Sequence, residues 1–235
     1  MSGILYLIPA PLGHNDIFLV VPQGVKHIVA TLDTFIVENA KSARQYLAGL
    51  GITVPLQNIK FDVLDEHTRP EELTALMQPL LSGKNIGLMS EAGCPGVADP
   101  GANLIRLAHT NGIRVVPLVG PSAILLALMA SGLNGQRFAF HGYLPVSIEE
   151  RIKKIMELEK ISKALDQTEI FIEAPYRNGK LLRSLLQCCK KTTLLCLATD
   201  ISLASESIAT KRISEWGGLP PNINRRPTVF LLYAA

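Results

Sequence analysis

Short apolar runs alternate along the chain with longer stretches in which apolar residues recur at helical spacing. The apolar runs predict strands, and the periodic stretches predict amphipathic helices. Strands that alternate with helices indicate an α/β protein whose sheets are largely parallel. Strands are predicted at residues 4–8, 27–38, 85–89, 113–119, 137–145, 169–175, 192–201 and 228–234. Helices are predicted at residues 39–51, 68–83, 100–109, 123–132, 148–165 and 179–190.

Several helix ends carry recognisable signals. Thr68 and Glu71 have the spacing of a capping box, and Gly83 is placed to end the helix that follows them. Asp99 is predicted to be the N-cap of the next helix, with Pro100 at its first position.

Three loops rich in glycine and proline follow predicted strands, at residues 9–13, 90–99 and 120–122. In open α/β sheets, ligands bind beyond the carboxyl ends of the strands, where backbone groups and helix N-termini face a crevice. Three such loops at successive strand ends predict a ligand crevice. We place the boundary between an N-terminal and a C-terminal α/β domain between residues 117 and 118.

Composition and motifs exclude several classes of protein. With 235 residues, 48% of them hydrophobic, the chain can build a sizeable core, and a net charge of +3 tolerates an anionic partner without requiring one. Its four cysteines lack the spacing of a zinc site, so we expect reduced thiols and no metal. The longest apolar run, residues 123–130, is too short to span a membrane, and the N-terminus lacks a signal-peptide pattern, so a soluble cytoplasmic protein is expected. The motifs of P-loop, dinucleotide-binding and nucleophile-elbow proteins are absent.

Five segments resemble one known family, and they stand in the family's order between residues 5 and 177. They are "LYLIPAPLG", "SEAGCPGVADPG", "GIRVVPLVGPSAILLALMASGL", "RFAFHGYLP" and "FIEAPYR". Together they resemble the tetrapyrrole-methylase superfamily of S-adenosylmethionine-dependent methyltransferases. Within it, they are most similar to the branch that methylates ribose 2′-hydroxyls of small-subunit ribosomal RNA.

This resemblance implies two α/β domains with S-adenosylmethionine bound in the cleft between them, and a homodimer. It also implies which residues contact the cofactor. Pro9 matches the first cofactor loop of the family, and Ser122 and Ala123 match another. The remaining matches are Gly93, Cys94 and Val97, in the loop after the strand predicted at residues 85–89. Tight loops with few side chains suit such a ligand, because backbone amides and carbonyls can then approach it.

Transfer of a methyl group to a ribose hydroxyl needs an acceptor for the hydroxyl proton. We expect Glu173 to act on the acceptor side, with Arg177 orienting it or a phosphate, and Glu91 to be a further candidate. A structural ion pair is the alternative interpretation of Glu173 and Arg177. Glu66 and His67 match a His-Glu-His segment of the RNA-methylating branch, although a solvated loop before a helix also explains them.

Some segments depart from the family pattern at places expected to meet RNA. Residues 38–41 read Glu-Asn-Ala-Lys where that branch has Glu-Asp-Thr-Arg, and Thr210 and Lys211 match only part of a later segment. A basic surface for RNA could come from two groups, Lys153, Lys154, Lys160 and Lys163, or Lys190, Lys191, Arg225 and Arg226. Two alternatives therefore stay open: methylation of a tetrapyrrole or other small molecule, and a cofactor-binding module without transfer activity.

Overall fold

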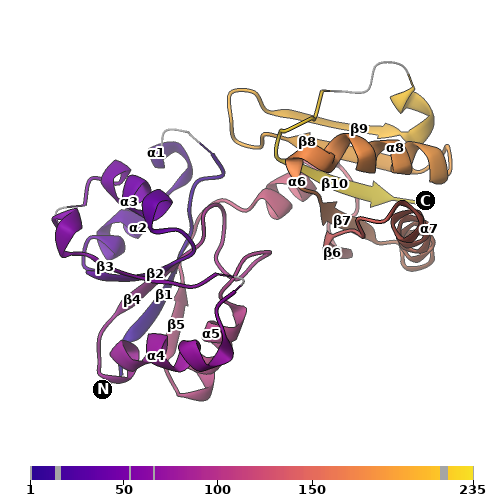
Figure 1. The fold of residues 1–235 in the computed structure, drawn as a ribbon. Helices are drawn as coiled ribbons and strands as arrows, with labels where there is room; N and C mark the ends of the chain where they lie inside the picture. Colours follow the sequence, from indigo (N-terminus) through magenta and orange to yellow (C-terminus); the bar gives the residue numbers. More distant parts are fainter. Residues whose placement is uncertain (1, 14–16, 53, 66, 218–221, 235) are drawn as a thin grey trace. The chain divides into compact units, whose positions relative to one another are not determined.

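The computed structural model describes residues 2–13, 17–52, 54–65, 67–217 and 222–234 (Figure 1). The chain forms two compact units, Met1–Ser122 and Ala123–Ala235. The predicted boundary falls a few residues earlier, at the end of a strand. Residues just beyond it still pack with the first unit, because the Leu118 amide donates to the Leu7 carbonyl oxygen. Within the described residues, no helix is both long and apolar enough to cross a membrane.

The first unit is a five-stranded parallel sheet with helices on both faces. Its strands lie in the order β3-β2-β4-β1-β5, and every neighbouring pair is parallel, as the sequence predicts. All five carboxyl ends therefore meet at one edge of the sheet. The elements are β1 (Ile4–Ile8), α1 (Ile17–Val20), α2 (Gln23–Val29), β2 (Thr34–Val37), α3 (Ala40–Gly49), η1 (Leu56–Asn58), β3 (Lys60–Val63), α4 (Pro70–Leu81), β4 (Ile86–Met89), α5 (Ala102–Thr110) and β5 (Arg114–Pro117).

Each face of this sheet has its own hydrophobic core. On one face, Phe35 and Ile8 pack with residues of α2 and α3, including Leu47. On the other face, Leu5 and Ile86 pack with residues of α4 and α5. A sheet buried on both faces explains why its strands read as continuous apolar runs.

Two predictions for this unit are corrected by the structure. Residues 27–29, predicted as the start of a strand, are the last turn of α2, because Val25 and Val29 lie four residues apart and bury one helical face. The predicted capping box is displaced by one residue. The backbone amide of Arg69, not Thr68, donates to the carboxylate of Glu72, at 2.9 Å.

The second unit contains a five-stranded sheet in the order β6-β7-β10-β8-β9. Only β6 and β7 run parallel, so the prediction of largely parallel sheets is wrong here. The predicted pattern also missed β9, which returns from β8 through a tight turn in which Asp200 and Ser202 have positive φ. Its elements are α6 (Ala123–Ser131), β6 (Phe138–Tyr143), α7 (Ile148–Leu165), β7 (Thr168–Ile172), η2 (Pro175–Arg177), α8 (Asn178–Cys188), β8 (Leu194–Thr199), β9 (Ser207–Arg212), η3 (Ile213–Trp216) and β10 (Thr228–Tyr233).

The helices of the second unit divide between the two faces of its sheet (Figure 1). Helices α7 and α8 cover one face, where Phe171 and Phe230 stack with ring centroids 5.9 Å apart. Helix α6 packs on the other face, against β8, β9 and β10.

Candidate functional site

Three loops that leave the first sheet meet beyond its carboxyl edge. The loops after β1 and β4 form an antiparallel bridge, in which the Ala10 amide donates to the Gly93 carbonyl oxygen at 2.8 Å and the Gly93 amide donates to the Ala10 carbonyl oxygen at 3.0 Å. The loop after β5 joins them, because the thiol of Cys94 donates to the Pro121 carbonyl oxygen at 3.4 Å. Adjacent parallel strands β4, β1 and β5 place these loops side by side.

Glycine is required at two points of this cluster. Gly93 has a φ of +71°, a conformation that residues with a Cβ rarely adopt. At Gly120, a Cβ atom would lie 2.2 Å from Cγ and 2.3 Å from Cβ of Pro9. The loop after β5 therefore packs directly against the Pro9 ring of the loop after β1, at a position where no side chain fits.

Helix α3 supports the cluster from one side. The hydroxyl of Tyr46, whose side chain is buried, donates to the Pro9 carbonyl oxygen at 2.8 Å. Burial raises the pKa of this phenol, which stays a hydrogen-bond donor at neutral pH. Asn39 begins the helix, since its side chain accepts from the amides of Lys41 and Ser42.

A pocket of about 290 Å³ opens between α3 and the loops after β1 and β4, next to the predicted cofactor residues but lined by none of them. Pro11 and Leu12 form one wall, and Tyr46 and Ser42 form another. Glu91 lies at its polar end, where it accepts from the Ser42 hydroxyl at 3.1 Å. The predicted carboxylate Glu91 is thus on the same side of the sheet as the predicted cofactor loops.

Asp99 is not a helix cap, which corrects the prediction made for it; it lies near enough to Glu91 to feel its charge, but it lines a separate pocket with Thr68 and Ala98. Helix α5 begins after Gly101, whose φ of +130° lies outside the helical region. The Asp99 carboxyl group is instead hydrogen-bonded with Ser90. Burial, its largest cause, and the negative charges of Glu38 and Glu91 together raise the pKa of Asp99 to about 6. A cation placed beside these three carboxylates would relieve that electrostatic cost.

These features fit S-adenosylmethionine as a ligand. Its sulfonium and amino groups are cationic, and the pocket offers them the carboxylate of Glu91, whose negative charge adds to those of nearby Glu38 and Asp99. Its adenosine and methionine parts can approach loops that Gly93 and Gly120 keep free of side chains.

The structure brings only part of the predicted cofactor set together. Pro9, Gly93 and Cys94 lie in the loop cluster, and Ser122 follows Pro121 directly, as the last residue of the first unit. Val97 lies further along the same loop, where its amide donates to the Cys94 carbonyl oxygen and its side chain is 47% exposed. Ala123 begins α6 in the second unit.

Glu173 and Arg177 form an ion pair in the second unit, after β7. Oε1 of Glu173 accepts from Nη2 of Arg177 at 2.6 Å, from its Nε at 2.8 Å and from the Ala174 amide at 2.7 Å. The hydrogen bond with Glu173 raises the pKa of Arg177. The second oxygen, Oε2, is buried without a hydrogen-bond partner among the described residues. An unpaired buried carboxylate oxygen is costly, so this atom is a candidate acceptor for a donor from a ligand.

Other expected residues play no such part. His67 is exposed, and its backbone amide donates to Asp65 in the turn before α4, while Glu66 lies outside the described residues.

The sequence analysis missed Tyr46 as a support for the loops, because a tyrosine in an apolar stripe reads as core. It also missed a buried pair in the second unit, in which Nε2 of His141 lies 2.5 Å from Oε2 of Glu169. The described residues contain no cluster of three or more histidine, cysteine or acidic side chains suited to a metal ion.

Sequence comparison identifies the family. No family model matches the chain. Ribosomal RNA small subunit methyltransferase I of Vibrio cholerae is 33% identical over 215 residues, which cover 91% of this chain and 70% of that protein. The protein of the same name from Haemophilus influenzae is also 33% identical, over 99% of this chain and 79% of its own length. The chain belongs to the ribosomal RNA small subunit methyltransferase I family.

Solved structures agree with the fold predicted from the resemblance. The methyltransferase CobJ has a TM-score of 0.65 with 18% identity, and the match covers 100% of this chain and 95% of CobJ. Uroporphyrin-III C-methyl transferase from Thermus thermophilus, complexed with S-adenosylhomocysteine, has a TM-score of 0.58 with 13% identity, over 98% of this chain and 97% of that one. This member of the ribosomal RNA small subunit methyltransferase I family therefore has the tetrapyrrole-methylase fold. The predicted enzyme class, methyltransferase, is confirmed.

Proposed function

We propose that this enzyme transfers the methyl group of S-adenosylmethionine to a ribose 2′-hydroxyl of small-subunit ribosomal RNA. The observation that carries the proposal is the family membership, joined to a cluster of loops whose geometry suits the cofactor. The predicted cofactor is confirmed at the level of the family, since the relatives are methyltransferases and a neighbour of the same fold is complexed with S-adenosylhomocysteine. The choice of the ribose 2′-oxygen comes from the resemblance of the sequence motifs.

The first unit binds the cofactor in this proposal. Pro9, Gly93, Cys94, Val97, Ser122 and Ala123 are the proposed contact residues. Bound there, the cofactor supplies an electrophilic methyl group on a positively charged sulfur. Glu91 and Asp99 lower the cost of that positive charge, and Tyr46 fixes the Pro9 loop on which the ligand would rest.

Glu173 acts on the acceptor in this proposal. Methyl transfer forms a carbon–oxygen bond at the ribose and breaks a carbon–sulfur bond, so the hydroxyl proton must leave. Oε2 of Glu173 accepts a hydrogen bond from that hydroxyl, while Arg177 holds Oε1 in place. Positioning of the two reactants supplies most of the remaining rate enhancement.

Transfer of a radiolabelled methyl group tests the proposal. Purified enzyme, labelled S-adenosylmethionine and small ribosomal subunits that lack the modification should give labelled RNA. A 2′-O-methyl group blocks alkaline cleavage of the next phosphodiester bond, because the 2′-oxygen can no longer attack phosphorus. We therefore expect the label in alkali-resistant dinucleotides. Label in mononucleotides would place the methyl group on a base, and label only in an added tetrapyrrole would support the small-molecule alternative.

Binding without transfer to any acceptor would support the other alternative, a module that holds the cofactor only. The homodimer and the cytoplasmic location stay predictions of the resemblance. Light scattering coupled to size-exclusion chromatography measures the first of them directly.

A further inference from the structure

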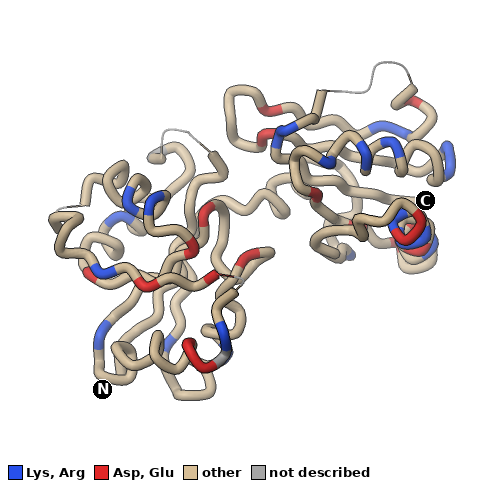
Figure 2. The backbone as a smooth tube through the Cα atoms, viewed as in Figure 1, with Lys and Arg blue, Asp and Glu red and all other residues tan. Residues whose placement is uncertain are grey.

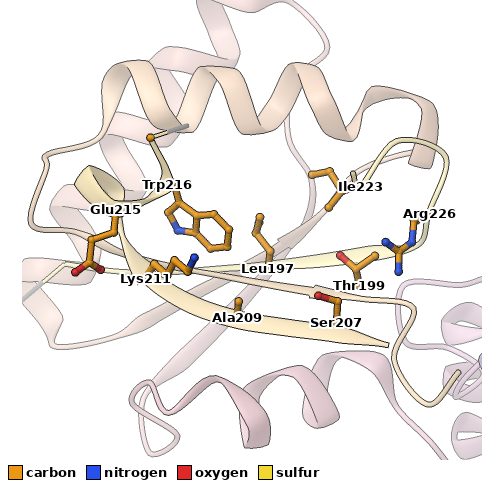
Figure 3. Close-up of a pocket in the computed structure, with 10 residues that line it drawn as sticks. Leu197, Thr199, Ser207, Ala209, Lys211, Glu215, Trp216, Ile223 and Arg226 are labelled. Carbon is orange, nitrogen blue, oxygen red and sulfur yellow. The ribbon is translucent and has the colours of Figure 1, made fainter. Parts of the chain in front are cut away.

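A second pocket lies in the second unit, on the face of its sheet that α8 covers. Its volume is about 290 Å³. Figure 3 shows Thr199 and Ser207 along its floor, Trp216 and Lys211 at one end, and Arg226 at the other. The indole of Trp216 is fixed, because its Nε1 donates to the Leu195 carbonyl oxygen at 3.2 Å. The pocket thus combines hydroxyl groups, one aromatic ring, two cations and the carboxylate of Glu215.

Helix α8 runs along this pocket from one end to the other. At its start, the side-chain amide of Asn178 donates to the carbonyl oxygens of Ile223 and Arg226. Just after its end, the carbonyl oxygen of Lys191 accepts from the Ser214 amide of η3, next to Trp216. Segments bonded to the two ends of α8 therefore line the pocket, and α8 lies beside it without lining it.

Seven exposed cations lie on α8 and on these segments, and we call them the basic rim. None of the seven forms an ion pair with any residue that the structure describes. Figure 2 shows that α8 carries Lys and Arg positions and no acidic one. The basic rim consists of Lys180, Arg183, Lys190, Lys191, Lys211, Arg212 and Arg225.

The two cations inside the pocket differ in their pairing. Arg226 is committed to the fold, because its guanidinium donates to Asp200 and to two backbone carbonyl oxygens. Lys211 is available to a ligand, with its Nζ 5.2 Å from the centre of the Trp216 ring. A ligand that enters here would meet an unpaired positive charge beside an aromatic face.

The other long helix of the unit shows a different charge pattern. Helix α7 has acidic and basic residues in similar number, and Lys154 pairs with Glu157 at 3.0 Å. An ampholytic helix of this kind is a solvated surface, whereas a run of unpaired cations repels itself unless an anion binds. The lysines of α7, one of the two basic groups found in the sequence, are therefore the weaker candidates for an RNA contact.

We propose that the basic rim contacts the phosphate backbone of the RNA acceptor and that the pocket beside Trp216 receives one of its unpaired nucleotides. The inference rests on the proposed function. Lysine and arginine contacts with phosphates supply most of the affinity for nucleic acids. Proteins that select a site in RNA read unpaired bases by stacking and hydrogen bonding, and in this pocket the exposed Ser207 hydroxyl and the exposed Lys211 ammonium group can form hydrogen bonds with a base.

Direct RNA binding tests the basic rim. The probe is a transcript of small-subunit ribosomal RNA, titrated at salt concentrations between about 50 and 200 mM. The double variant Lys180→Glu/Arg183→Glu should bind at least tenfold more weakly. The slope of log affinity against log salt should fall by about 1.4 for two lost phosphate contacts on single-stranded RNA. The matched control is Lys153→Glu/Lys160→Glu, which makes the same charge change at exposed positions of α7 and should bind as the unaltered enzyme does.

A second pair of variants tests the pocket. Ser207→Phe places a ring over the floor of the pocket at an exposed position of β9, and Ser207→Ala removes only the hydroxyl. We expect the phenylalanine variant to lose its preference for RNA with unpaired segments over fully paired RNA, with its salt dependence unchanged. The alanine variant should keep that preference.

The outcomes separate this inference from the proposed function. RNA affinity that is equal in the rim variant and its control would overturn the inference, even if the enzyme methylates RNA. Rim-dependent RNA binding without methyl transfer would support the inference and contradict the proposed function. If the rim variant binds naked RNA normally but no longer binds intact ribosomal subunits, the partner of the rim is a ribosomal protein, and the inference is wrong.

Discussion

A single methyl group at Gly120 should disrupt the candidate cofactor site. In Gly120→Ala, the new Cβ would lie 2.2 Å from Cγ of Pro9, whereas ordinary contacts of such atoms begin near 3.4 Å. The two loops must separate by about an ångström to relieve the overlap. Overpacking of this kind costs about 1–3 kcal/mol of unfolding free energy. The bridge between Ala10 and Gly93 would move with the Pro9 loop.

Two measurements detect the effect of Gly120→Ala. Calorimetric titration with S-adenosylhomocysteine should give an affinity at least tenfold weaker than that of the unaltered enzyme, because about 1.4 kcal/mol of lost contacts suffices for a factor of ten. Denaturant unfolding should give a free energy of unfolding lower by about 1–3 kcal/mol.

A matched glycine provides the control. Gly24 lies in α2, and a Cβ atom there would meet nothing within 4 Å. Gly24→Ala should leave cofactor affinity unchanged and raise stability slightly, because alanine is the better helix former by about 0.5–1 kcal/mol. If Gly120→Ala binds S-adenosylhomocysteine as Gly24→Ala does, the loop cluster is not the cofactor site.

Three further changes test other parts of the structure. Because the pKa of Asp99 is raised to about 6, the folded state favours the protonated carboxyl group, so stability should fall as pH rises from about 4 to 6. In Asp99→Asn, unfolding measured across that range should lose this pH dependence, which solvent screening of the half-exposed carboxyl group limits to about 1 kcal/mol, and an unchanged profile would contradict the assignment. His141→Ala removes the partner of Oε2 of the buried Glu169 carboxylate, whose Oε1 still accepts from Gln167, and should lower the unfolding free energy by about 1–3 kcal/mol, while no measurable loss would mean that water replaces the imidazole. Glu173→Gln should reduce the methyl-transfer rate at least about 100-fold with S-adenosylhomocysteine affinity unchanged, whereas a loss of stability alone would make its pairing with Arg177 structural.

The sequence predicted the first unit better than the second for a physical reason. A parallel sheet covered on both faces needs continuous apolar strands separated by helices, and both patterns are legible from periodicity. In the second unit, β9 is half exposed and polar, with Ser207, Thr210 and Lys211 among its residues, so it gave no apolar run. Its pairing with β8 depends on a turn in which Asp200 and Ser202 adopt positive φ, which residue type alone does not predict.

The candidate site was partly predictable because its loops are built from residues with special backbone geometry. Gly93 and Gly120 are visible in the sequence as members of tight loops after strands. The grouping of Glu38, Glu91 and Asp99 was not predicted, although Glu91 was a candidate, because it joins two separate chain segments, the end of β2 and the loop after β4. Pro100 after Asp99 predicted a helix start, but α5 begins only after Gly101. The Asp99 carboxyl group therefore does not cap the helix and is hydrogen-bonded with Ser90.

The substitution of Asn39 within residues 38–41 bears on whether the chain has kept its activity. In the structure, the Asn39 side chain accepts from the amides of Lys41 and Ser42 at the start of α3. Asparagine and aspartate are nearly equivalent as N-caps, so this departure from the family pattern preserves the helix start. Helix α3 in turn supplies Tyr46 to the Pro9 loop and Ser42 to Glu91. Residues 38–41 therefore still support the site, and their departure from the family pattern is no argument by itself for a cofactor-binding module without transfer activity. Asn39→Asp should therefore leave the unfolding free energy within about 0.5 kcal/mol, and a larger gain in methyl transfer than in cofactor affinity would show that the missing carboxylate acts on the acceptor.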